Sequence, residues 1–100
     1  MIKKHMIELC LLRLLSGADM YGYEILHRLE EVFPGTKEGE IYVLLRGLFR
    51  DGYTECYRGE RSDGPVRKYY RITDTGRKRQ NELQNEWRKL QEAMENLGIR

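Results

Sequence analysis

Apolar residues at helical spacing predict an amphipathic helix over residues 37–52. Its inward stripe holds four residues at i, i+3, i+4 and i+7, namely Ile41, Leu44, Leu45 and Leu48. The opposite side combines cations with a bare backbone position, at Gly39, Val43, Arg46 and Arg50, with Tyr42 and Phe49 at its flank. Such a face suits a phosphate-lined groove, because helix N-terminal amides attract anions and a glycine lets a DNA backbone approach closely. A solvated helix face has a similar pattern, so the neighbouring segments have to decide between the two.

The chain before this helix predicts two more helices. Residues 2–16 are apolar on almost every side, which is typical of a helix buried on several faces. In the next segment, apolar side chains recur at helical spacing at Tyr21, Ile25, Leu29 and Val32. The expected caps and stops are, in chain order, Ser16-Gly17, Asp19, Pro34-Gly35, Thr36 and Asp51-Gly52. Three helices are therefore expected before any strand.

After Gly52 the pattern changes to short segments rich in β-branched and aromatic residues. Residues 53–58 and 66–73 predict two strands, and residues 59–65 predict the hairpin loop between them. The hairpin carries five cations, at Arg58, Arg61, Arg67, Lys68 and Arg71. It should therefore project positive charge near the outward face of the third helix.

A long last helix is expected from about Asp74 to Leu97, with Thr73-Asp74 as its N-terminal cap. Its apolar residues are spaced 4, 3, 4 and 3 apart, at Leu83, Trp87, Leu90, Met94 and Leu97. A seam this narrow packs against another helix, and we expect it to be the dimer interface.

Three helices, a two-stranded basic hairpin and a terminal helix are the parts of a dimeric winged helix-turn-helix protein. The expected fold class is therefore α+β and mostly helical. We expect residues 1–73 to form the DNA-binding domain and residues 74–100 to form the dimerisation helix, within one compact unit. In this arrangement the third helix lies in the major groove, and the wing reaches the flanking backbone or minor groove.

Composition narrows the classes of function. A chain of 100 residues holds one small domain, and a core of that size gains from a partner subunit. The net charge is only +2, but residues 37–79 hold eleven Lys or Arg against seven Asp or Glu, so the basic region is local. Cys10 and Cys56 lie far apart without a Cys/His cluster, so we expect reduced, buried thiols and no metal or cofactor. No signal peptide or membrane span is evident, which favours a cytoplasmic protein.

Four motifs in the same order resemble the PadR family of bacterial transcriptional regulators over nearly the whole chain. They are residues 11–15 (LLRLL) with 20–25 (MYGYEI), residues 38–45 (EGEIYVLL), residues 64–73 (GPVRKYYRIT) after Asp51-Gly52 and before Gly76, and Glu86-Trp87. The resemblance implies a homodimeric DNA-binding repressor of the short subfamily, which has a single C-terminal helix.

The chain departs from the family pattern within the expected recognition helix. Glu40 and Val43 stand where the family usually has Thr and Pro, and Leu48-Phe49 stands for its usual LE pair. A carboxylate at Glu40 can accept a hydrogen bond from a cytosine amino group or repel a phosphate. We therefore expect the operator to differ from the family's common palindrome.

The expected DNA contacts come from the third helix and the wing. They are Lys37, Gly39, Glu40, Tyr42, Val43, Arg46, Arg50, Arg61, Arg67 and Lys68. Surface charges alone would explain Arg67 and Lys68, but the family match favours phosphate contact. Tyr42 is either a phosphate contact or a half-buried aromatic with a wet hydroxyl, and Arg46 is either a base reader or a phosphate clamp.

The terminal helix offers a second candidate site. Trp87 either packs in the dimer core or stacks on a ligand, as in some PadR-like proteins that bind flat aromatic drugs at the dimer centre. The tentative ligand-binding residues are Met6, Leu9, Trp87 and Met94. The resemblance identifies no particular inducer.

The sequence thus favours a transcriptional repressor over other classes. We expect it to bind a pseudo-palindromic operator in double-stranded DNA and to be relieved by a small planar or phenolic effector. The alternative is a winged-helix protein-interaction module whose basic face docks an acidic partner. An enzyme is not expected, because the chain has no Ser/His/Asp set, phosphate loop or metal-ligand cluster.

Overall fold

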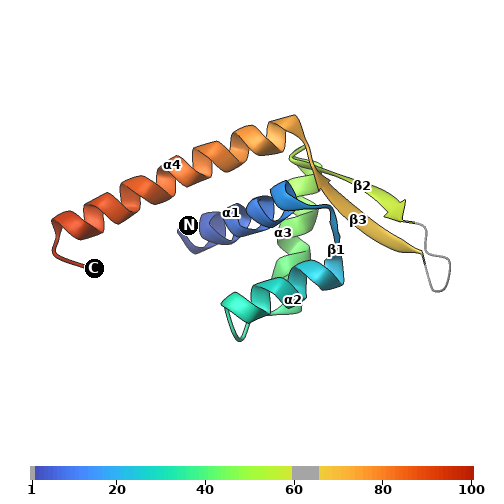
Figure 1. The fold of residues 1–100 in the computed structure, drawn as a ribbon, viewed down its shortest axis with the longest axis horizontal. Helices are drawn as coiled ribbons and strands as arrows, with labels where there is room; N and C mark the ends of the chain where they lie inside the picture. The colour runs from blue at the N-terminus through green and yellow to red at the C-terminus, as the bar shows by residue number, and fades with distance from the viewer. Residues whose placement is uncertain (1, 60–65) are drawn as a thin grey trace.

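The computed structural model describes residues 2–59 and 66–100 of the chain. These residues form four helices and a small antiparallel sheet (Figure 1). The elements are α1 (Ile2–Gly17), β1 (Met20–Tyr21), α2 (Gly22–Val32), α3 (Glu38–Arg50), β2 (Thr54–Gly59), β3 (Arg67–Ile72) and α4 (Asp74–Asn96). The strand order is β1-β3-β2, with both pairs antiparallel. The expected α+β, mostly helical winged-helix fold is confirmed.

The core lies where α1, α2 and α3 meet β3 and the start of α4. Its centre is apolar throughout, with Leu11, Leu12, Ile25 and Leu45 fully buried. Leu83 of α4 joins the same core and is 2% exposed. α1 is thus the buried helix that its apolar composition predicts, because three other helices and a strand cover it.

The strand β1 was not expected before the third helix. It pairs with β3 through Met20 opposite Tyr70 and Tyr21 opposite Tyr69. A strand of only two residues has no detectable hydrophobic periodicity, so the sequence pattern could not predict it. It forms because the free edge of β3 provides its hydrogen-bonding partner. β1 ties the start of α2 directly to the wing.

Two of the expected helix caps are wrong. Asp19 does not cap α2, because its carboxylate accepts the hydroxyl of Tyr57 at 2.6 Å. Tyr21 takes the cap position instead, and its N–H donates to the Glu24 carboxylate at 3.2 Å. Thr36 does not cap α3, since its hydroxyl donates to the Phe33 carbonyl and Lys37 precedes the helix.

The cap of the last helix is confirmed. The Thr73 hydroxyl accepts the Gly76 N–H at 3.0 Å and donates to the Gly52 carbonyl at 2.7 Å. Gly76 is needed for close packing, because a Cβ there would lie 2.0 Å from the carbonyl oxygen of Tyr53. This junction joins the wing to α4.

The far half of α4 extends beyond the rest of the chain (Figure 1). All residues from 91 to 100 are exposed, and Leu97 is 79% exposed. Val32 at the end of α2 is also 69% exposed, so the apolar residues that α2 buries are Ile25 and Leu29.

Candidate nucleic-acid interface

The two sides of α3 separate as the sequence predicts. Ile41, Leu45 and Leu48 are at most 2% exposed, so this side packs into the core. The opposite side is exposed at Gly39, Glu40, Val43, Arg46 and Arg50, and Lys37 just before the helix is exposed as well. Buried leucines thus fix the rotation of the helix and leave its mixed cationic side outward.

Gly39 is not required by the fold. Its backbone does not have a positive φ, and a Cβ placed there would meet no atom within 4 Å. Packing within the chain therefore does not require a glycine at this position. It leaves space for another molecule to approach the first turn of α3, where the free N–H groups attract anions.

Tyr42 lies at the flank of α3 and is half-buried. Its ring occupies the space beside Gly22, where a Cβ would lie 2.8 Å from the ring and 2.9 Å from the hydroxyl oxygen. Burial, and then the Glu38 carboxylate and Tyr70, raise the pKa of the Tyr42 phenol. The hydroxyl consequently remains protonated at neutral pH and can donate a hydrogen bond.

Arg67 and Lys68 lie on opposite faces of the wing, because successive side chains alternate along a strand. The Lys68 Nζ is 5.5 Å from the ring centre of Tyr70 and 5.8 Å from that of Phe49, on the α3 side. The Arg67 Cζ is 4.3 Å from the ring centre of Tyr21, on the other face. Only Lys68 therefore shares a surface with α3. Arg61 lies outside the described residues.

A row of tyrosines crosses the outer face of the sheet, and the sequence interpretation did not identify it. Tyr57 stacks on Tyr69 at 5.5 Å, and Tyr69 meets Tyr21 edge-on at 5.6 Å. The row continues onto α2, where Tyr23 stacks between Tyr21 and His27. No spacing in the sequence marks this row, because Tyr57 meets Tyr69 through the pairing of β2 with β3 and the contribution of Tyr21 depends on β1.

Three of the four tentative ligand-binding residues lie together. Met6, Leu9 and Trp87 line a cavity of about 110 Å³ between α1 and α4. Trp87 also lines a second cavity of about 360 Å³ on the α2 side of α1. Met94 lines neither and is 40% exposed. Of the expected seam, Leu83 is already buried within the chain, so the residues available to a partner begin at Trp87.

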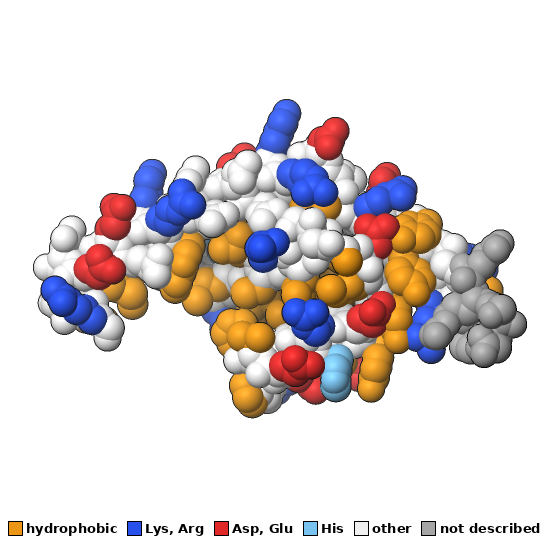
Figure 2. Space-filling view, viewed as in Figure 1, with side chains coloured by type: hydrophobic (Ala, Val, Ile, Leu, Met, Phe, Trp, Pro, Cys, Tyr) orange, Lys and Arg blue, Asp and Glu red, His pale blue; other side chains and the backbone are white. Residues whose placement is uncertain are grey.

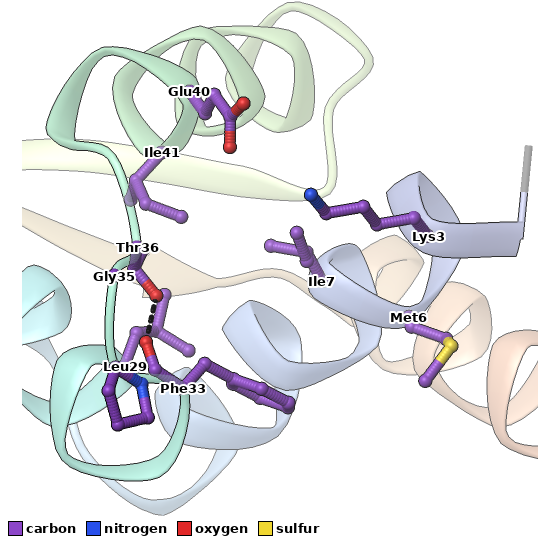
Figure 3. Close-up of a pocket in the computed structure, with 10 residues that line it drawn as sticks. Lys3, Met6, Ile7, Leu29, Phe33, Gly35, Thr36, Glu40 and Ile41 are labelled. Atoms are coloured by element: carbon purple, nitrogen blue, oxygen red, sulfur yellow. Dashed lines mark hydrogen bonds between the residues drawn. The ribbon is translucent and has the colours of Figure 1, made fainter.

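A larger cavity of about 460 Å³ lies between α1, the end of α2 and the first turn of α3 (Figure 3). Its walls are mostly apolar, with Ile7, Leu29 and Phe33 among them, and Lys3 and Glu40 are the charged residues in its lining. This cavity could not be predicted from the sequence, because its walls come from three separate segments.

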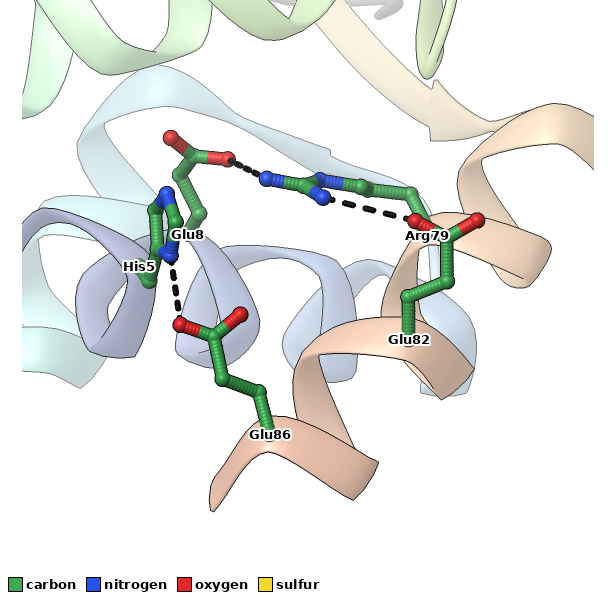
Figure 4. Close-up of polar contacts among 5 residues, drawn as sticks. All are labelled: His5, Glu8, Arg79, Glu82 and Glu86. Atoms are coloured by element: carbon green, nitrogen blue, oxygen red, sulfur yellow. Dashed lines mark hydrogen bonds and ion pairs between the residues drawn. The ribbon is translucent and has the colours of Figure 1, made fainter. Parts of the chain in front are cut away.

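Ion pairs fasten α4 to α1 (Figure 4). His5 Nδ1 lies 2.7 Å from Glu86 Oε1, and the Arg79 guanidinium lies 3.7 Å from Glu8 and 3.4 Å from Glu82. The hydrogen bond from His5 lowers the pKa of the Glu86 carboxyl. The pairs His5–Glu86 and Glu8–Arg79 thus link α1 to α4, next to the buried Leu83.

The two thiols are free and partly buried. Burial raises the pKa of both Cys10 and Cys56, and Lys68 opposes this effect only partly at Cys56. A protonated thiol is a poor nucleophile and a poor metal ligand. Within residues 2–59 and 66–100, no three His, Cys, Asp or Glu side chains form a group that would hold a metal ion. No helix in the described part of the chain is long and apolar enough to cross a membrane.

Comparison with known proteins decides the family. The model of the family described as "Transcriptional regulator PadR-like family" matches residues 11–82, which include α3 and both wing strands. The chain belongs to this PadR-like family. PadR-like proteins are transcriptional regulators, and this chain is accordingly a regulator and not an enzyme.

Solved PadR-like structures match the whole arrangement of helices and wing. A PadR-like regulator from Bacillus cereus is 35% identical, with 91% of this chain and 89% of that chain covered and a TM-score of 0.82. A PadR family regulator from Clostridium difficile is 29% identical, with 91% and 96% covered and a TM-score of 0.83. A Lysinibacillus sphaericus protein is 35% identical over 92 residues, or 89% of this chain and 84% of its own length.

A structure of Bacillus subtilis PadR in complex with operator DNA is more distant. It is 24% identical, with a TM-score of 0.67, and the match covers 77% of this chain and 45% of that one. At this distance the likeness shows the shared PadR fold alone.

Proposed function

We propose that this PadR-like chain is a homodimeric repressor that binds operator DNA through α3 and the wing. The outward side of α3 is the observation that carries the proposal. It presents Arg46 and Arg50 on the same side as the bare backbone of Gly39, while Leu45 and Leu48 are buried in the core. Cations and backbone amides at a helix start are the groups that contact DNA phosphates.

The wing extends this surface on one side. The Lys68 ammonium lies 5.8 Å from the ring centre of Phe49, near the end of α3, so it adds positive charge on the α3 side of the wing. The B. subtilis PadR structure contains operator DNA, which supports the same class of partner for this chain. A bacterial regulator that binds operator DNA would act where the chromosome is, which supports the cytoplasm as its location.

A second copy of the chain supplies the other half of the repressor. The last turns of α4 and its tail expose Met94, Leu97 and Ile99. In a monomer these apolar side chains would stay in contact with water, which is unfavourable. Burial of these residues against a partner's helices would hold the two α3 helices of the dimer at a fixed spacing. Each α3 could then enter one of two successive major grooves, at half-sites about one helical turn apart.

A small planar or phenolic effector at the dimer interface would relieve repression. Trp87 and Leu9 line both of the cavities beside α4, so a flat ligand in either cavity could contact the Trp87 ring. Movement of α4 would change the spacing of the two α3 helices, and hence their fit to the operator. Unchanged Trp87 fluorescence across a panel of planar aromatics and phenolic acids would contradict this part.

Binding to the DNA upstream of the chain's own gene tests the proposal. We expect fluorescence anisotropy to detect binding to a labelled fragment, and Arg46→Ala to weaken it. Arg88→Ala is the matched control, because it removes an exposed arginine from α4 instead of α3. Equal effects of the two substitutions would contradict the assigned surface.

The alternative function uses the same face to dock an acidic protein. The exposed carboxylate of Glu40 on that face is the feature that favours it. Loss of binding to a candidate acidic partner in Arg46→Ala, with DNA binding unaffected, would support the alternative.

A further inference from the structure

We propose that Tyr21 is a positioning residue that holds the Arg67 guanidinium ready to contact a DNA phosphate. This inference rests on the proposed DNA binding. It assigns Arg67 to a different phosphate from Lys68, because the two side chains lie on opposite faces of the wing.

The geometry at Tyr21 is that of a stacked cation. The Arg67 Cζ lies 4.3 Å from the centre of the Tyr21 ring, the shortest cation-to-ring distance among the described residues. Stacking uses the flat face of a guanidinium and leaves its N–H donors at the edge, where a phosphate oxygen can accept them. A stacked arginine also has fewer rotamers to lose on binding.

The Tyr21 ring is itself fixed from several directions. Tyr21 is a residue of β1, opposite Tyr69 of β3, and it is also the cap residue of α2. Its N–H donates to Glu24, and its ring meets Tyr69 edge-on. The backbone bonds do not depend on the side chain, so substitution of the ring leaves β1 and the cap in place.

The surroundings place this pair on a continuous surface. In Figure 2, hydrophobic side chains, a class that includes tyrosine, extend from the sheet towards α2. Gly59, opposite Arg67 in the sheet, leaves the space that the Tyr69 ring fills, since a Cβ there would lie 2.2 Å from that ring. The absence of a side chain at Gly59 therefore makes room for the Tyr69 ring, which in turn meets the Tyr21 ring beneath Arg67.

Arg71 provides an internal comparison on the same face. Its Cζ lies 5.0 Å from the Tyr57 ring, but its Nε donates to the Glu55 carboxylate at 2.9 Å. An arginine paired in this way has donors already in use. Arg71→Ala removes the same charge as Arg67→Ala and so controls for a general electrostatic effect.

A double-mutant cycle on operator binding tests the inference. We expect Tyr21→Leu to weaken binding about two- to fivefold, and Tyr21→Phe, which keeps the ring, to bind like the original chain. Arg67→Ala should reduce the slope of log affinity against log salt by about one, and Arg71→Ala should reduce it less. Adding Tyr21→Leu to Arg67→Ala should cause no further loss, because the ring acts through the arginine.

Three results would overturn the inference. They are equal losses of DNA affinity from Tyr21→Leu with and without Arg67, equal losses of affinity from Tyr21→Phe and Tyr21→Leu, or an unchanged salt slope in Arg67→Ala.

A readout without DNA separates this inference from the proposed function. In the NMR spectrum of the DNA-free protein, the ring of Tyr21 should shift the Arg67 side-chain protons upfield. The Tyr21→Phe variant should keep this shift, and the Tyr21→Leu variant should lose it. If the shift is present and DNA binding is absent, the proposed function fails; if the shift is absent, the positioning fails.

Discussion

Arg67 and Lys68 are neighbours in β3, yet Arg67 lies over Tyr21 on the outer face and Lys68 lies beside Phe49 on the α3 face. A basic pair in the sequence therefore becomes two separate cationic positions. Strand alternation causes the separation, and β1 on one face and α3 on the other determine what each cation contacts.

Lys68→Ala should weaken DNA binding by removing a phosphate contact next to α3. We expect the slope of log affinity against log salt to fall by about one, with little change in sequence preference. Lys78→Ala is the matched control, because Lys78 is an exposed lysine on α4. Parallel salt titrations of the two variants measure the difference, and an unchanged slope in Lys68→Ala would exclude the contact.

Gly39→Ala should separate stability from DNA binding. A Cβ there meets nothing in the chain, and alanine favours helix over glycine by up to about 1 kcal/mol, so the free energy of unfolding should rise. Operator affinity should nevertheless fall, because the methyl group would stand between α3 and the DNA backbone. Chemical denaturation and anisotropy on the same preparation test both halves; unaltered affinity would show that DNA does not approach this turn.

Gly22→Ala should disturb Tyr42. The added Cβ would lie 2.8 Å from the Tyr42 ring, and overpacking of this kind costs about 1–3 kcal/mol in the free energy of unfolding. Gly17→Ala is the control, since a Cβ at Gly17 has no atom within 4 Å. Thermal unfolding of the two variants should show a loss only in Gly22→Ala, and equal midpoints would contradict the packing of Tyr42 against α2.

Helical periodicity was enough to predict which side of α3 faces the core. Ile41, Leu45 and Leu48 lie on one side of the helix, so only one rotation of the helix buries all three. The same reasoning failed where tertiary partners compete with local preference. Asp19 is a good helix cap in isolation, but the Tyr57 hydroxyl takes its carboxylate. The positions of Arg67 and Lys68 in the second wing strand were also predictable, whereas the ring that each cation contacts depends on β1 and α3, which lie far away in the sequence.

The pair of His5 and Glu86 should make stability depend on acid pH. The hydrogen bond lowers the pKa of the Glu86 carboxyl from its ordinary 4.5, so its stabilising effect is present above pH 4.5 and is lost as the pH falls through the lowered value. Glu86→Gln lacks this titration. Unfolding midpoints of the two proteins should therefore converge as the pH falls below about 4.5, and a constant difference would contradict the pairing.

Leu97→Glu should weaken self-association without unfolding the chain. Leu97 is 79% exposed in the single chain, so a charge there costs the core nothing but would be unfavourable within an apolar interface. Val66→Glu is the control, because Val66 is 60% exposed next to the wing. Light scattering after size exclusion should give a lower mass for Leu97→Glu only. The original mass in both variants would place the dimer interface elsewhere.

The salt dependence of binding to the chain's own upstream DNA tests the central claim most directly. If α3 and the wing contact phosphates, the affinity should fall steeply between about 50 and 200 mM salt, and Arg46→Ala should show a shallower slope. An affinity that does not respond to salt, or a slope that Arg46→Ala leaves unchanged, would contradict DNA recognition by this face of α3.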